Sequence, residues 1–133
     1  MTDFANFLIP QGADWIQQIV LQNDDGSPMN LTDCQVHMQI RAFPGSPIVL
    51  LDLSTATGTI TLKPYPAQIN WSVPASQTAA LQPQLGTALS LQPAPNSAQL
   101  GYYDLLIEYP GGHIPPPYMS GQVFLQLGIT IPF

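Results

Sequence analysis

Residues 24–41 decide the fold, and they read DDGSPMNLTDCQVHMQIR. The stretch opens on Asp, Gly, Ser and Pro, which are the residues that form turns, and then changes to a regular alternation of polar and apolar side chains. Val36, Met38 and Ile40 would point to one face, and the polar residues between them to the other. Side chains of a strand alternate between faces, whereas a helix needs apolar residues three and four apart. The pattern therefore predicts a half-buried strand over residues 34–41.

The same two-residue period recurs along the chain. It predicts strands over residues 14–22, 34–41, 48–53, 59–63, 68–73, 101–109 and 122–131. One segment, residues 75–81, follows Pro74 and is rich in Ala, so it predicts a single short helix. Short strands with a turn signal about every ten residues indicate an all-β, antiparallel β-sandwich of about seven strands. Its core should include Ile40, Trp71 and Leu125.

Two segments do not fit the strand period. Residues 1–13 predict an extended N-terminal arm ahead of a sandwich domain over residues 14–133, and residues 82–100, rich in Pro and Gln, predict a long loop. The arm carries large apolar side chains, so it should be held on its own sheet or on a neighbour. Of these two placements, we expect packing on an adjacent subunit. The apolar side chains of the arm are Phe4, Phe7, Leu8 and Ile9.

The composition points to contact with other proteins. Arg41 and Lys63 are the only basic residues, against eight carboxylates, which argues against binding to nucleic acid or to anionic lipid. Charged residues make up 8% of the chain, whereas a typical soluble domain has about 25%. Apolar residues make up 45%. A surface of this kind is expected in a permanent assembly, because interface cores are depleted in charge.

The remaining sequence signals concern the cellular compartment. Cys34 is the single cysteine, so the fold must be held by packing, and a buried thiol is favoured over a reactive one. No leader pattern opens the sequence, and apolar runs such as residues 48–51 are far shorter than the ~20 residues of a membrane span. We therefore expect a product that stays in the cytoplasm of the cell that makes it, without membrane insertion.

Few residues could support catalysis. His37 lies on the polar face of a predicted strand and His113 in a Gly-rich turn, so a shared site is not favoured. Residues 24–26, Asp-Asp-Gly, lack the alternating spacing and the closing Glu of a calcium loop. We expect no enzyme activity, no metal and no cofactor. An alternative function is recognition of a receptor or a host-surface glycan by aromatic side chains in loops, for which the candidates are Tyr65, Tyr102, Tyr109, His113 and Tyr118.

The order of motifs resembles an immunoglobulin-like module of tailed-bacteriophage structural proteins. The motifs that carry the resemblance are residues 9–13 (IPQGA), 25–32 (DGSPMNLT), 38–41 (MQIR), 58–62 (GTITL), 78–81 (TAAL), 103–105 (YDL) and 121–123 (GQV). Together they span most of the chain outside residues 82–100. The chain departs from the family pattern in that loop, which looks like an insertion, and in its uncharged end, residues 128–133 (GITIPF).

This resemblance implies an immunoglobulin-like fold and a non-enzymatic role in the virion, assembled in the host cytoplasm. The chain would join or decorate tail, neck or baseplate components, and its partners would be other virion proteins and copies of itself. The arm, the long loop and the tail are the segments expected to make subunit contacts. The candidate interface residues are Phe4, Phe7, Leu8, Ile9, Pro93, Pro95, Pro116, Tyr118 and Phe133.

Overall fold

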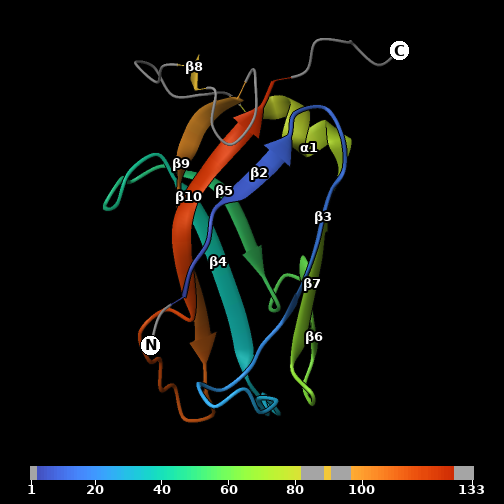
Figure 1. The fold of residues 1–133 in the computed structure, drawn as a ribbon, viewed down its shortest axis with the longest axis vertical. Coiled ribbons are helices and arrows are strands. Elements are labelled where there is room, and N and C mark those ends of the chain that lie inside the picture. The colour runs from blue at the N-terminus through green and yellow to red at the C-terminus, as the bar shows by residue number, and fades with distance from the viewer. Residues whose placement is uncertain (1–2, 82–88, 91–96, 128–133) are drawn as a thin grey trace.

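The computed structural model describes residues 3–81, 89–90 and 97–127, and these residues form mainly strands (Figure 1). In chain order the elements are β1 (Asp3–Phe4), β2 (Phe7–Pro10), β3 (Trp15–Val20), β4 (Gln35–Arg41), β5 (Val49–Ser54), β6 (Ile60–Lys63), β7 (Gln68–Val73), α1 (Ala75–Ala80), β8 (Leu89–Ser90), β9 (Ser97–Glu108) and β10 (Met119–Gln126). The predicted helix and the predicted strands from residues 14 to 73 are all present, with ends shifted by one or two residues.

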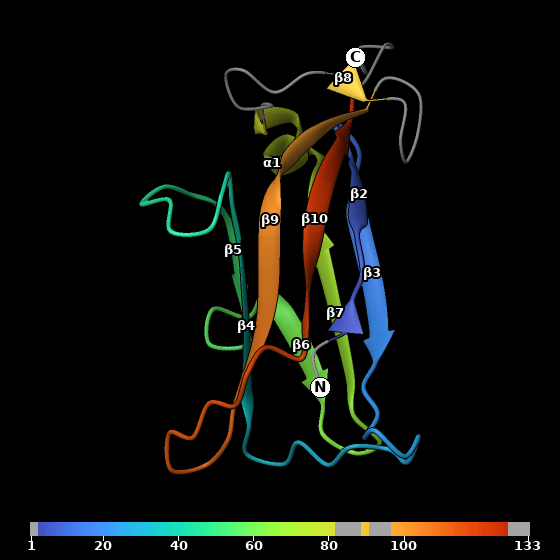
Figure 2. The same cartoon turned by 60° about the vertical axis from the view of Figure 1, so that its left-hand side comes forward.

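The strands form two sheets that face each other across the core (Figures 1 and 2). The larger sheet has the order β1-β10-β9-β4-β5, with β2 also beside β10 and β8 beside β9, and the smaller sheet has the order β3-β7-β6. The smaller sheet is antiparallel, as expected, but the larger sheet is mixed. The expectation of a purely antiparallel fold is wrong because β1 and β2 run alongside β10 in the same direction.

The alternation in the sequence correctly assigns the buried face of the strands. In β4, Val36, Met38 and Ile40 are all at most 1% exposed, while the residues between them face outward. The same holds for Trp71 in β7 and Leu125 in β10, which are also buried. Both sheets contribute to one hydrophobic core.

The turn that precedes β4 is built as its composition predicts. Gly26 has a φ of +86°, which a side chain would disfavour. The backbone N–H and the hydroxyl of Ser27 both donate hydrogen bonds to the Asp25 carboxylate, at 2.9 and 2.6 Å. These bonds favour the ionised carboxylate and lower the pKa of Asp25. The Asp-Gly cluster is thus a turn whose hydrogen bonds are made within the turn itself.

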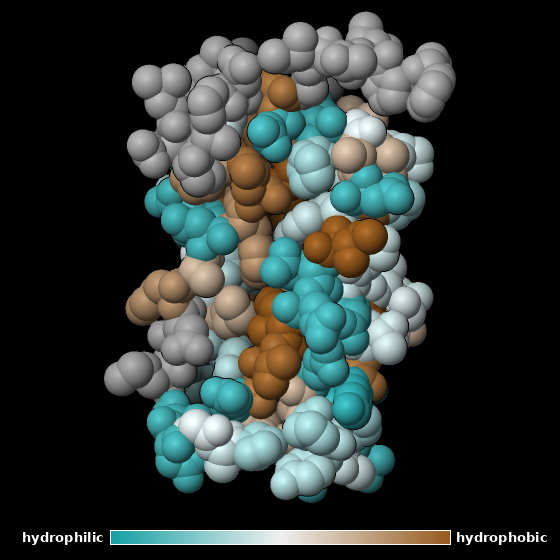
Figure 3. All heavy atoms as spheres, turned by 45° about the vertical axis from the view of Figure 1, so that its right-hand side comes forward, coloured by the Kyte–Doolittle hydropathy of each residue, from teal (hydrophilic) through white to brown (hydrophobic). Residues whose placement is uncertain are grey.

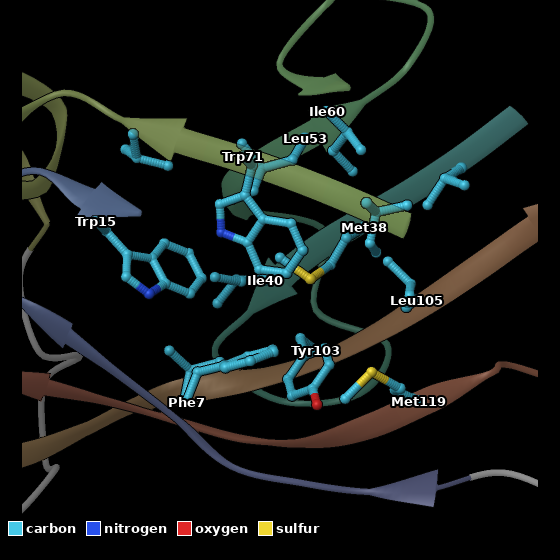
Figure 4. Close-up of a cluster of buried hydrophobic side chains, with 14 of the residues drawn as sticks. Phe7, Trp15, Met38, Ile40, Leu53, Ile60, Trp71, Tyr103, Leu105 and Met119 are labelled. Carbon is cyan, nitrogen blue, oxygen red and sulfur yellow. The ribbon is translucent and has the colours of Figure 1, made fainter. Parts of the chain in front are cut away.

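Aromatic rings occupy the centre of the core (Figure 4). The Phe7 ring lies 5.6 Å from Trp15, 5.7 Å from Trp71 and 4.7 Å from Tyr103, measured between centroids. The two indoles contact each other edge to face at 5.4 Å. Such pairs contribute about 0.5–1.5 kcal/mol each beyond the area that they bury. One side chain from the expected arm is therefore at the middle of the chain's own core.

This placement corrects the interpretation of the arm. Phe7 is 8% exposed and Ile9 is fully buried, so neither side chain can contact an adjacent subunit in this fold. The physical reason is the pairing of β2 with β10, which places alternate arm residues on the inner face of the larger sheet. Between β1 and β2 the backbone passes so close to Gly121 that a Cβ there would lie 1.9 Å from the Ala5 carbonyl oxygen.

The helix is fixed by the turn that joins β2 to β3. The Asp14 carboxylate accepts a hydrogen bond from the N–H of Ala75, the first residue of the helix, at 2.8 Å. The fully buried Thr78 hydroxyl donates to the Ala13 carbonyl at 2.7 Å and accepts from the Gly12 N–H at 3.1 Å. These tertiary bonds support a helix that is too short to be stable alone.

Two predicted boundaries differ from the structure. β9 begins at Ser97, so the end of the predicted loop over residues 82–100 is a strand that pairs with β10. Residues 82–88 and 91–96 of that loop lie outside the described residues. At the other end, β10 runs from Met119 to Gln126, and residues 128–133 also lie outside them.

Candidate functional site

A groove of about 800 Å³ lies on the outer face of the larger sheet. Four aromatic residues line it: Tyr103 is buried, whereas Phe4, Phe43 and Tyr102 are 83%, 56% and 36% exposed. Its polar lining includes Gln39, Asp104 and Gln122. We call this concavity, defined by these three exposed aromatic and three polar residues, the outer groove. Its volume lies within the ~300–1,000 Å³ typical of ligand sites.

Strand alternation builds the floor of the outer groove. Gln39 and Asp104 are cross-strand partners in β4 and β9, and Gln122 pairs with Tyr102 across β10 and β9. These positions face away from the core because their neighbours in sequence are buried. Phe4 enters from β1, at the edge of the sheet next to β10. The groove therefore crosses several strands of the sheet.

The opposite wall is the connection between β4 and β5, which projects from the sheet (Figure 2). Arg41, the last residue of β4, holds this loop: one guanidinium nitrogen donates to the Ser46 carbonyl and the other donates to the Gln39 side chain at 2.7 Å. Ser46 is 4% exposed, and its N–H donates to the Phe43 carbonyl at 3.1 Å. Phe43 is thus exposed on a loop with internal support.

The two charged side chains of the outer groove differ in how far they are free to contact a ligand. Arg41 uses its guanidinium within the protein, as described above. Asp104 is exposed on the floor. An aromatic rim around a carboxylate and two amides can bind hydroxyl-bearing or cationic groups, through hydrogen bonds on the floor and stacking on the rings. Arg41 also lines the groove, but its guanidinium already donates to the Ser46 carbonyl and to the Gln39 side chain.

A second hollow, of about 230 Å³, lies where the β9–β10 connection meets the turn after β3. Its lining includes Pro116 and Tyr118, both predicted as interface residues, together with Tyr109. The Tyr118 hydroxyl accepts a hydrogen bond from the Gln22 N–H at 3.1 Å. Tyr118 therefore already connects the two ends of this hollow, and its hydroxyl has a structural partner.

His37 and Asp52 form a pair on the outer face of the larger sheet. His37 Nε2 lies 2.7 Å from Asp52 Oδ1, and the two side chains are 47% and 52% exposed. Exposed pairs of this kind contribute about 0–1 kcal/mol. Within residues 3–81, 89–90 and 97–127, no three His, Cys, Asp or Glu side chains are grouped closely enough to hold a metal ion. The same residues include no helix of the length and apolarity needed to cross a membrane.

The predicted interface residues separate into five groups. Phe4 lines the outer groove, and Pro116 and Tyr118 line the second hollow. Phe7 and Ile9 belong to the core, as corrected above, while Leu8 is half-buried on β2. The remaining candidates, Pro93, Pro95 and Phe133, lie outside the described residues.

The aromatic residues proposed for glycan recognition are also dispersed. Tyr65 is exposed on the connection from β6 to β7, in the smaller sheet, whereas Tyr102 lies in the outer groove. Tyr109 and His113 contact each other, with ring centroids 6.2 Å apart, on the β9–β10 connection. The structure therefore brings Tyr102 together with two phenylalanines rather than with the other tyrosines.

Sequence reasoning missed Phe43 and the exposed apolar side chains of β3, Ile16 and Val20. Pro44 and Gly45 follow Phe43, so the local sequence predicts a turn and gives no sign of an exposed aromatic side chain in a groove. A local signal exists for Ile16 and Val20, because both are apolar residues at positions that alternate with the inward-facing Trp15 and Ile19. The chain matches no protein-family model, and no similar curated protein was found.

Proposed function

We propose that this chain is a non-enzymatic structural protein of a bacteriophage virion, with an immunoglobulin-like fold, that joins or decorates tail, neck or baseplate components. Its partners would be other virion proteins and copies of itself. The order of strands supports the fold part of this proposal. In a variable-type immunoglobulin domain, strands G, F, C and C′ form one sheet and B, E and D belong to the other.

The strands correspond in order. β10, β9, β4 and β5 take the places of G, F, C and C′, while β3, β7 and β6 take those of B, E and D. An arm strand beside G is compatible with this arrangement, since it extends the same sheet. The aromatic cluster of Phe7, Trp15, Trp71 and Tyr103 fills the centre, where antibody domains have a disulfide.

One observation carries the assembly part of the proposal: large apolar side chains are exposed on both outer faces. Phe4 and Phe43 lie on the larger sheet and its loop, while Ile16 and Val20 lie on the smaller sheet, and each is at least 55% exposed. The chain has few charged residues with which to keep such faces in water. Apolar faces that are rimmed by polar residues typically mark interaction surfaces.

Light scattering of the purified chain over a range of concentrations tests this proposal. We expect concentration-dependent association, together with binding of an apolar fluorescent dye that decreases as the chain associates. A chain that remained monomeric at high concentration and bound no dye would refute the proposal. Ile16→Lys and Val20→Lys, which change one surface only, distinguish a chain that does not associate at all from a chain that has lost one particular contact.

The outer groove favours one other candidate function, which is binding of a host-surface glycan. Sugars present apolar C–H faces and hydroxyl groups, and the groove offers aromatic rings beside a carboxylate and amides. A glycan array separates the two functions. Binding that is lost in Tyr102→Ala and Phe43→Ala, but kept in the control Tyr65→Ala, would support recognition. Absence of binding across the array would remove this candidate.

A further inference from the structure

The open edge of β3 is the feature that the fold leaves unexplained. Among the described strands, β3 pairs only with β7, and its other edge has no neighbour. Its sequence, WIQQIV, has no charge, no Pro and no Gly. On the outer face, Ile16 and Val20 are 71% and 55% exposed. Figure 3 shows the side of the molecule on which β3 lies, where apolar and polar surface alternate.

The other sheet edges carry the usual protection. β6 has four residues and ends in Lys63, β5 carries the exposed Asp52, and β2 has four residues and ends in Pro10. Short length, charge and proline are the means by which natural sheets prevent pairing with other chains. Because β3 has none of them over six residues, it is suited to accept another strand.

The chain itself contains a segment that fits this edge. Residues 127–133 read LGITIPF, with Leu127, Ile129 and Ile131 in alternate positions and no charged residue. The alternation is that of a strand, and it continues the pattern of β10 beyond its end at Gln126. The Gln126 carbonyl accepts a hydrogen bond from the Gln11 N–H, so β10 ends near the turn that leads into β3.

The path from the end of β10 to β3 favours a second copy over the same chain. Residues 128–133 and β3 are equally long, and each spans about 20 Å when extended. To reach its own β3, the tail would first have to cross from one sheet to the other, a distance of about 10 Å. That crossing would use about three of residues 128–133, and the other three would be too few to cover the six residues of β3. In a neighbouring copy the same six residues need not make the crossing.

We infer that residues 128–133 of one copy add as an extra strand to the open edge of β3 in the next copy. This inference rests on the proposed assembly function and names the contact that would produce it. The contact joins two different surfaces, so it repeats from copy to copy and generates a ring or a filament. The added strand pairs with the backbone of β3, and its side chains cover Ile16 and Val20.

Cysteine cross-linking between two different chains tests the contact directly. In a Cys34→Ala background, one chain carries Gln18→Cys in the middle of β3 and the other, of different mass, carries Ile129→Cys. A mild oxidant is added to the mixed chains. The matched control replaces Gln18→Cys by Thr61→Cys, because Gln18 and Thr61 pair with the same residue, Asn70, from opposite sides of β7.

We expect at least ten times more mixed dimer with Gln18→Cys than with Thr61→Cys. Equal yields from the two positions would overturn the inference. A single chain can also carry both Gln18→Cys and Ile129→Cys. If it formed an internal disulfide at high dilution, the inference would be overturned, since the tail would then cover its own β3.

Sedimentation velocity gives an independent readout. Ile16→Lys, Val20→Lys and a chain that ends at Leu127 should each raise the dissociation constant for self-association at least tenfold, and Thr61→Lys should leave it unchanged. Circular dichroism checks that each variant is folded. Association that survives all three changes would overturn the strand-addition inference and leave the proposed assembly function standing. A monomeric wild-type chain would overturn both.

Discussion

Phe4 and Phe7 form a matched pair of aromatic residues on one short segment, and truncating each to Ala tests where the N-terminal segment belongs. Phe7 is 8% exposed and contacts three other aromatic rings in the core. Phe4 is 83% exposed at the rim of the outer groove. We expect Phe7→Ala to destabilise the monomer strongly and Phe4→Ala to leave its stability almost unchanged.

The structure sets the size of the difference. Truncating a buried Phe to Ala costs about 3–5 kcal/mol, because apolar contacts are lost and a cavity remains. Ring contacts to Trp15, Trp71 and Tyr103 place Phe7 towards the upper end of that range. For a domain of this size the loss corresponds to a fall of roughly 10–18 °C in the unfolding midpoint. An exposed substitution such as Phe4→Ala typically changes stability by less than about 0.5 kcal/mol.

Urea unfolding followed by tryptophan fluorescence measures both variants at a dilution where the chain is monomeric. A matched loss in Phe4→Ala and Phe7→Ala would refute the reasoning. The reasoning would also be refuted if the Phe7→Ala monomer were as stable as the wild type but failed to associate. Phe7 would then contact a neighbouring subunit, as the sequence alone suggests.

Three further predictions concern single sites. Gly121→Ala should lower the free energy of unfolding by roughly 1–3 kcal/mol or more, because the added Cβ would lie 1.9 Å from the Ala5 carbonyl oxygen and the strand must move. Ser120→Ala is the control, and equal stability of the two variants would show that the backbone yields easily. Burial raises the pKa of Tyr103 to about 12. The folded state therefore holds this proton more tightly than the unfolded chain, so the stabilisation is complete below about pH 10 and is lost as pH rises towards about 12. Between about pH 10 and pH 12 the free energy of unfolding should fall by up to about 2–3 kcal/mol more in the wild type than in Tyr103→Phe. Urea midpoints that change with pH in the same way in both proteins would contradict this. Burial, together with the nearby Asp33 charge, raises the pKa of the Cys34 thiol. A thiol reagent at neutral pH should therefore modify Cys34 more slowly than free cysteine, and a rate at or above that of free cysteine would contradict this prediction.

Much of the fold could be predicted because a two-residue period reports burial directly. Val36, Met38 and Ile40 identify their strand and its inner face without any tertiary information, and the structure confirms both. The helix over residues 75–80 was equally accessible from its Pro and Ala content. In these segments local preference and tertiary packing favour the same structure.

The remaining features depend on contacts between distant residues. Nothing local indicates that residues 7–10 pair with residues 123–126, and a parallel pair leaves no hairpin signal in the sequence. The outer groove is equally invisible locally, because Phe4, Phe43 and Tyr102 come from three separate segments that only the sheet brings together. Their sequence neighbours favour turns and strands but give no distance between them.

The pairing of β2 with β10 also has a consequence for how the chain is made. Because β2 needs the backbone of β10, the sheet edge that covers Phe7 and Ile9 cannot form until residues 123–126 have left the ribosome. Contacts so distant along the chain form slowly, since a long loop must close first. Throughout synthesis the nascent protein therefore exposes two of its core side chains, and this is the interval in which it is most exposed to aggregation and most dependent on chaperones.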